Sequence, residues 1–225
     1  MNKSIIEFIR ESGGFFGIVG AIAVTISALF SYFYNTLVDP SFTIMSRAVS
    51  DLATGPKISS IIYSVGLITA SFCQYPLYFS LIHYLRQDLD HFLLIKTTKL
   101  GAIISIVSHN IVSVIPFERN IFLIYLVHGI AAGIHYVTGS IILLLYGILE
   151  VLSRKVSKIY IIMSFISGAL YGLVWIGYLL FFIIGTSEIG INHSIQWIAY
   201  AGIILWSLLQ GVLLTKKNKR NFKNS

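Results

Sequence analysis

The chain has 225 residues, of which 56% are hydrophobic and only 11% are charged. With a mean hydropathy of +0.83 and several apolar runs of about 20 residues, it is not an ordinary soluble domain; this composition indicates an integral membrane protein built of helices. The net charge of +7 therefore does not indicate a nucleic-acid partner, and the single Cys73 excludes a disulfide framework or a thiolate metal site.

The chain begins with a short amphipathic segment. Ser4 and Glu7 have the spacing of a capping box, and the apolar residues beside them suit an interfacial helix within residues 1–13. Gly13-Gly14 is expected to end this segment. The apolar run that follows is longer than the roughly 7–15 residues of a signal-peptide core, so we expect it to be retained.

Six apolar runs are interpreted as membrane spans. They lie at residues 14–34, 58–85, 100–115, 121–149, 157–184 and 194–214. The sequence thus predicts an all-α fold, a polytopic bundle of six transmembrane helices over residues 14–214. Pro76 is expected to kink the second helix. The connection 35–57 is the longest polar one, and residues 86–99 form a charged connector.

Lys and Arg are distributed unevenly between the two sides of this bundle. The N-terminus, the second and fourth connections and the C-terminus hold 13 of them, against 3 in the other connections. The positive-inside rule therefore predicts that both termini are cytoplasmic. A basic tail over residues 215–225 suits contact with the anionic cytoplasmic leaflet. Its basic residues are Lys216, Lys217, Lys219, Arg220 and Lys223.

Histidines mark the candidate site, because histidine inside a span usually faces another helix or a cavity. His128 and His135 recur with Ala132 and Gly139 on one face of the fourth helix. Counting the helical rise from the turn at 116–120 places His109 and His128 at one depth, facing each other. The predicted outward-facing polar pocket consists of Asp51, His109, His128 and His135, with Glu118, Arg119 and Gln196 at its rim.

Small and aromatic residues add two expectations about packing. Three Gly-x-x-x-Gly pairs are expected to pack helices inside the monomer: Gly13 with Gly17, Gly129 with Gly133, and Gly168 with Gly172. An interfacial aromatic belt is expected from Trp175, Tyr178, Trp197 and Tyr200.

The chain contains none of the common soluble-enzyme motifs. We expect a pocket that binds an amphipathic ligand such as a phospholipid head group, with Arg119 on the phosphate. We expect this lipid-handling or regulatory role to be non-catalytic and to need no cofactor or metal.

Two alternatives stay open. One is an intramembrane metal-dependent hydrolase of lipids, using Ser108, Asp51, His109, His128, His135 and His193. His128 and His135 are about 10.5 Å apart along one helix, too far to share a zinc ion. The set of His109, His128 and Asp51 stays geometrically possible. The other is a small-solute or proton-coupled transporter that uses the histidines as a relay.

Several short motifs resemble a known family. They are Ser50-Asp51-Leu52-x-x-Gly55 before the second helix, Pro116 in a polar turn, His128-Gly129 in the fourth helix and Gln196-Trp197 opening the last. Over residues 14–214 the chain resembles the domain-of-unknown-function 998 family of bacterial and archaeal proteins, which is similar to the eukaryotic FRAG/DRAM/SFK superfamily of six-span proteins. It departs from the pattern at Ser105, Ser108 and Gln196. The resemblance implies a lipid-associated role in a bacterial or archaeal cell membrane.

Overall fold

The computed structural model of the chain describes residues 3–89, 91–115, 121–184 and 190–223. Its long helices are α1 (Lys3–Val38), α2 (Lys57–Leu85), α3 (Phe92–Val114), α4 (Phe122–Ser153), α5 (Lys158–Ile184) and α6 (Gly190–Lys223). Two short 3-10 helices, η1 (Val49–Ala53) and η2 (Arg86–Asp88), lie in the connections, and the described residues include no strand. The all-α expectation is confirmed, and each long helix contains a segment apolar and long enough to cross a membrane.

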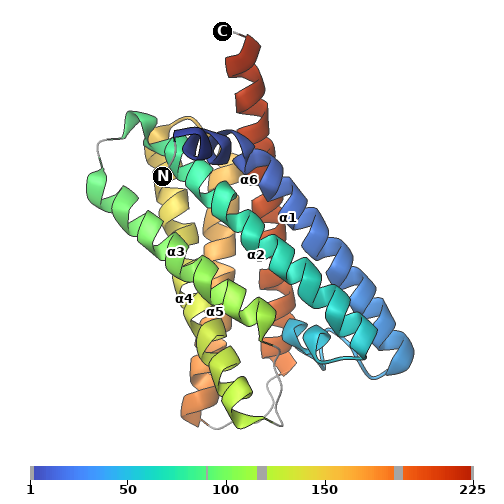
Figure 1. The fold of residues 1–225 in the computed structure, drawn as a ribbon. Helices are drawn as coiled ribbons and strands as arrows, with labels where there is room; N and C mark the ends of the chain where they lie inside the picture. Colours follow the sequence, from blue (N-terminus) through green and yellow to red (C-terminus); the bar gives the residue numbers. More distant parts are fainter. Residues whose placement is uncertain (1–2, 90, 116–120, 185–189, 224–225) are drawn as a thin grey trace.

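The six long helices form a closed ring in sequence order. Each helix contacts the next one along the chain, and α6 closes the ring against α1. Because the helices alternate in direction, both chain termini and η2 lie at one end of the bundle, and η1 lies at the other (Figure 1). The interior of the ring is therefore bounded by all six helices.

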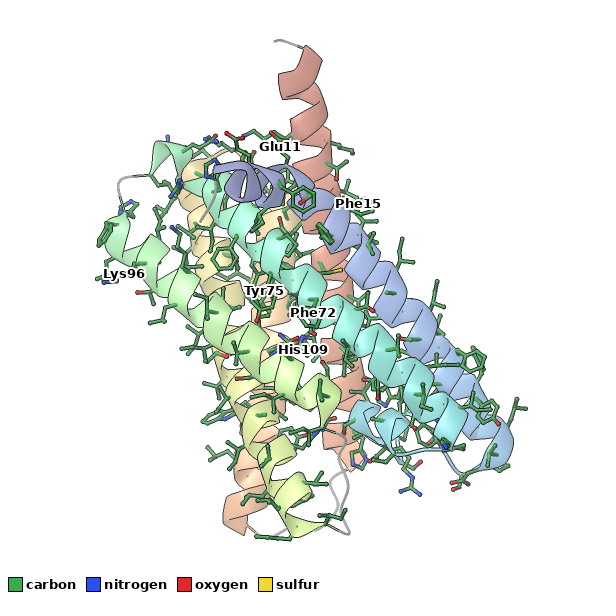
Figure 2. All side chains as sticks on the ribbon, in the orientation of Figure 1. Glu11, Phe15, Phe72, Tyr75, Lys96 and His109 are labelled. Atoms are coloured by element: carbon green, nitrogen blue, oxygen red, sulfur yellow. The ribbon has the colours of Figure 1, made fainter. Side chains whose placement is uncertain are left out.

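The outer surface of the ring is rich in large apolar side chains. Phe15 and Phe72 are 61% and 62% exposed on this surface, whereas His109 lies between the helices (Figure 2). An outer face of this kind is typical of helices that contact lipid rather than water.

The glycines near the N-terminus do not end the helix as expected, because α1 continues through them without interruption. They allow close packing instead. A Cβ atom at Gly14 would lie 2.7 Å from the backbone nitrogen of Thr215, and one at Gly211 would lie 2.8 Å from the carbonyl oxygen of Gly14. Backbone approach at this distance holds α1 against α6 and needs residues without a side chain.

The three Gly-x-x-x-Gly pairs behave differently from one another. Gly13 and Gly17 pack against neighbouring helices, and a Cβ atom at Gly168 would lie 2.9 Å from the side chain of Leu144. At Gly129 and Gly133, by contrast, no described atom lies within 4 Å of the added Cβ. The expectation that this pair packs inside the monomer is therefore wrong.

The third helix begins at Phe92, eight residues before the predicted start of its span at Leu100. Its first turn is apolar and lies on the outer surface, with Phe92 76% exposed. The ammonium group of Lys96 lies 6.0 Å from the centre of the Phe92 ring. Charged residues on either side of this turn lower the mean hydropathy of a window that includes it without preventing a helix, so such a window places the start of the helix too late.

Candidate functional site

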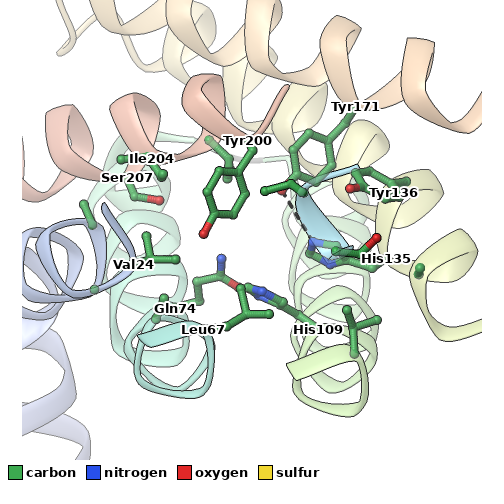
Figure 3. A pocket seen from close by; sticks show the side chains of 18 of the residues that line it. Val24, Leu67, Gln74, His109, His135, Tyr136, Tyr171, Tyr200, Ile204 and Ser207 are labelled. Atoms are coloured by element: carbon green, nitrogen blue, oxygen red, sulfur yellow. Dashed lines mark hydrogen bonds between the residues drawn. The ribbon is translucent and has the colours of Figure 1, made fainter. Parts of the chain in front are cut away.

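A long cavity lies inside the ring, and all six helices and η1 contribute to its wall (Figure 3). On α2 its lining extends from Tyr63 to Leu77, a rise of about 21 Å. Its empty volume is about 940 Å³, including space open to the outside, but the centres of water molecules can occupy only about 80 Å³ of it. The cavity is therefore long and narrow, with room for a slender molecule or a short file of waters.

Apolar and small side chains form most of the cavity wall. The polar lining residues are Ser50, Gln74, His109, His128, His135, Gln196 and Ser207, together with Tyr63, Tyr136, Tyr171, Tyr178 and Tyr200. The described lining includes no Lys, Arg, Asp or Glu. The cavity thus offers hydrogen bonds from neutral groups and no side chain that carries a permanent charge.

Two stacked histidines form the centre of the polar part (Figure 3). The ring centres of His109 and His135 lie 4.5 Å apart, with 22° between their planes. His109 Nδ1 donates to Gln74 Oε1 over 3.0 Å. His135 Nδ1 donates to the carbonyl oxygen of Ser105 over 3.1 Å, so His135 Nε2 is left to accept from the Tyr171 hydroxyl at 3.4 Å. Groups from four helices, α2 to α5, therefore meet at this point.

The expected pairing of His109 with His128 is wrong, because the expectation ignored the register of α3 against α4 and the direction of helical side chains. Each side chain tilts toward the N-terminus of its own helix. The helices α3 and α4 are antiparallel, so the side chains of His109 and His135 tilt in opposite directions. His135 bonds to the carbonyl oxygen of Ser105, one helical turn before His109, and the two rings meet because each tilts toward the other. His128 tilts toward the end of α3, where its Nδ1 bonds to the carbonyl oxygen of Ile115.

Three cavity groups have hydrogen-bonding capacity that no described residue uses. His109 Nε2 is an acceptor because its Nδ1 carries the proton, and the Gln74 amide nitrogen has donors to spare. The buried Tyr200 hydroxyl faces the Tyr63 hydroxyl but makes no hydrogen bond of normal length and angle with a described residue. Figure 3 shows Gln74, His109 and Tyr200 around the same part of the cavity. A ligand there would be met by one acceptor, one donor and one hydroxyl group.

Asp51 lies in η1, at the end of the bundle opposite the termini. Its buried carboxylate accepts the backbone N–H of Ala48 over 2.9 Å, which caps this short helix. Asp51 is not a lining residue, but Val49, Ser50 and Ala53 beside it are. In this structure its carboxylate therefore shapes one end of the cavity.

Gln196 lies in the cavity wall rather than on a rim. It is buried, and its amide nitrogen donates to the Tyr178 hydroxyl over 2.9 Å. This contact ties α5 to α6. The other two predicted rim residues, Glu118 and Arg119, lie outside the described residues.

Sequence reasoning missed Gln74 as a site residue and assigned Tyr178 and Tyr200 to an interfacial belt, whereas both tyrosines line the cavity. The signals were present. Gln74 is an amide inside an apolar span, and Tyr171 and Tyr178 are seven residues apart on one helical face.

The described residues contain no group of three or more His, Cys, Asp or Glu side chains placed to hold a metal ion. Comparison of the chain with protein-family models, with curated proteins and with solved structures gives no significant match.

Proposed function

We propose that this chain is a membrane protein that binds a lipid-like molecule inside its helix ring and acts in lipid handling or regulation rather than in catalysis. The long, narrow, mostly apolar cavity with a few unused polar groups supports this proposal. Such a cavity accepts an apolar chain along its length, and the polar groups fix the position of one hydrogen-bonding group.

The chemistry of the wall favours an uncharged head group. A hydroxyl group of the ligand would donate to His109 Nε2, and a carbonyl oxygen would accept from the Gln74 amide. A phosphate at this level would lack a cationic partner among the described lining residues, and burying an unpaired charge is costly. Arg119, which was expected to contact a phosphate, lies outside the described residues.

The orientation and the family assignment are part of the proposal. Both termini lie at one end of the ring, together with η2, which agrees with a cytoplasmic placement of the basic termini. A bacterial or archaeal cell membrane and membership of the domain-of-unknown-function 998 family rest on the short sequence motifs. The basic C-terminal tail would contact anionic lipids there.

Cysteine labelling tests the orientation. Thr43, in the connection between α1 and η1, and Ser157, in the connection between α4 and α5, are both exposed, whereas the native Cys73 is buried. These two connections lie at opposite ends of the bundle (Figure 1). In intact cells an impermeant thiol reagent should label Thr43→Cys and not Ser157→Cys. The reverse pattern would place the η1 end in the cytoplasm.

A filled cavity tests the binding function. Ala132 lines the cavity and is 7% exposed, whereas Ala201 is exposed on the outer surface of α6. We expect native mass spectrometry of the wild-type protein in mild detergent to show a bound lipid. Ala132→Phe should lose that lipid, because the new ring occupies its space, and the matched variant Ala201→Phe should keep it.

Two results would contradict the proposal. One is a wild-type protein, purified from its own membrane, that carries no lipid. The other is equal lipid occupancy in the two phenylalanine variants when both elute as folded, monodisperse proteins.

One observation favours proton-coupled transport as a second candidate. His109 and His135 are two titratable groups side by side in a cavity with room for a few waters, and a proton relay needs such groups joined by water. Vesicles containing the protein and a pH-sensitive dye should then equilibrate a proton gradient faster than empty vesicles, and His135→Phe should remove the difference. Equal rates for wild-type and empty vesicles would eliminate this candidate.

A further inference from the structure

A second buried polar cluster lies near the end of the ring that carries the termini. It consists of Glu150 on α4, Ser164 on α5, and Trp206 and Gln210 on α6, all with 0% exposure. None of these residues lines the cavity. An ionisable side chain buried among membrane helices is costly to keep unless it has a partner or a function.

Aromatic rings separate this cluster from the cavity on the α4 and α6 side. The ring centres of Tyr78, Tyr146 and Trp206 lie 5.5 to 5.6 Å from one another. Tyr146 is one helical turn before Glu150, and the Tyr146 hydroxyl donates to the carbonyl oxygen of Tyr78 over 3.0 Å. The cluster is therefore a separate site, and its argument does not rest on the proposed lipid function.

The hydrogen bonds of the cluster leave two acceptors without a donor. The Gln210 amide nitrogen donates to Glu150 Oε1 over 2.6 Å, and the Trp206 indole N–H donates to Ser164 Oγ over 2.8 Å. Glu150 Oε2 and Gln210 Oε1 are buried and have no hydrogen-bond partner. Both unpaired atoms belong to the same two side chains, which already share one hydrogen bond.

No cation compensates Glu150 among the described residues. The groups that face it from the packed elements are neutral: Tyr146 on its own helix, Ser164 from α5 and Gln210 from α6. Lys155 and Lys217 lie at this end of the bundle, and their ammonium groups sit 5.7 and 3.4 Å from the centre of the Tyr84 ring. A carboxylate at Glu150 would therefore be a buried, unpaired charge.

We propose that Glu150 is a proton-binding site. A proton taken from water onto Glu150 Oε2 turns this acceptor into a donor for which Gln210 Oε1, on the side chain that already bonds to Glu150, is an unpaired acceptor, so one added hydrogen can satisfy both atoms. The carboxyl and amide groups then form a reciprocal ring of two hydrogen bonds. Release of the proton leaves a negative charge without a partner, so it requires this end of the helix ring to open to water.

Infrared spectroscopy of the membrane-embedded protein at neutral pH tests this assignment directly. We expect a C=O stretching band of a protonated carboxyl group in the wild type, lost in Glu150→Gln and retained in the matched variant Asp39→Asn, which changes an exposed carboxylate. The double variant Glu150→Gln/Gln210→Glu exchanges the two groups and should restore the band. An unchanged spectrum in Glu150→Gln would overturn the proposal.

Thermal unfolding gives a second readout. In Glu150→Gln the new amide N–H supplies the same donor as the proton, so the midpoint should move by no more than about 2–4 °C. Gln210→Leu removes the ring partner and should lower the midpoint by more than this. A wild-type midpoint that depends on sodium relative to potassium would show that a bound cation, and not a proton, pairs the two oxygens.

Discussion

The stacked histidine pair gives the sharpest test of the site geometry, because the structure couples His109 to His135 and not to His128. His135→Ala removes the bonds to Ser105 and Tyr171, each worth about 1 kcal/mol net. It also removes the ring contact with His109, worth about 0.5–1.5 kcal/mol. The total destabilisation should be about 3 kcal/mol.

The same estimates predict the coupling energy between His109 and His135. His109→Ala loses one hydrogen bond, to Gln74, and the same ring contact, so it should cost about 2 kcal/mol. Because both single variants lose the one ring contact, the double variant should cost about 1 kcal/mol less than the sum. His109 bonds to Gln74 and His128 bonds to the Ile115 carbonyl, so the effects of His109→Ala and His128→Ala should add within about 0.5 kcal/mol.

Reversible unfolding in mixed micelles, followed by tryptophan fluorescence, measures all four free energies of unfolding in each cycle. Additive costs for His109 and His135, or a larger coupling between His109 and His128, would refute the geometry described for this pair.

Three further predictions concern the backbone and the loop at the η1 end. Arg154 ends α4 with a φ of 54°, so Arg154→Gly should stabilise the protein by about 1 kcal/mol in the same unfolding assay. Gly14→Ala should cost about 1–3 kcal/mol by overpacking, whereas its matched control Gly129→Ala points into open space and should be neutral or stabilising by up to about 1 kcal/mol. The Ser41 hydroxyl and N–H bond to the Asp39 carboxylate and hold its pKa below the usual value, so Ser41→Ala should raise that pKa in a carboxyl NMR titration. A group whose pKa is lowered by folding contributes stability above its unfolded pKa and loses it as pH falls through the folded value. In Ser41→Ala this contribution should therefore be smaller, and its loss in acid should be complete at a higher pH than in the wild type.

Hydropathy was enough to predict the six helices, because a run of about twenty apolar residues can cross a membrane as an α-helix that satisfies its own backbone hydrogen bonds. It failed at helix ends. The first turn of α3, from Phe92, carries charged neighbours that a hydropathy window scores as a connector. The helix through Gly13 was predicted to break because glycine is a weak helix former, but contacts with two other helices outweigh that preference.

The sequence predicted that His109, His128 and His135 lie in the pocket, but it did not predict which of them contact each other. Counting rise from a turn gives the depth of a Cα atom, whereas contact depends on the tilt of the side chain and on the register of the partner helix. His109 therefore meets His135, which lies two helical turns along α4 from the expected partner His128. Gln74 belongs to no periodic pattern, so only the ring arrangement, which brings α2 beside α3, reveals it as a partner of His109.

Buried polar side chains in this protein fall into two kinds, distinguished by whether their hydrogen bonds are complete. Between α1 and α2, the Asn35 amide donates to Ser59 Oγ at 2.6 Å, and Ser31 Oγ donates to the Ser59 carbonyl at 2.9 Å, with no buried side-chain atom of these three left unpaired. The role of such a cluster is structural, because its hydrogen bonds hold the two helices together. At Gln74 and Glu150 the bonding is incomplete, one group facing a cavity and the other enclosed. The enclosed site is proposed to bind a proton and the cavity a larger molecule, and the two sites share no residue, so the two proposals can fail independently.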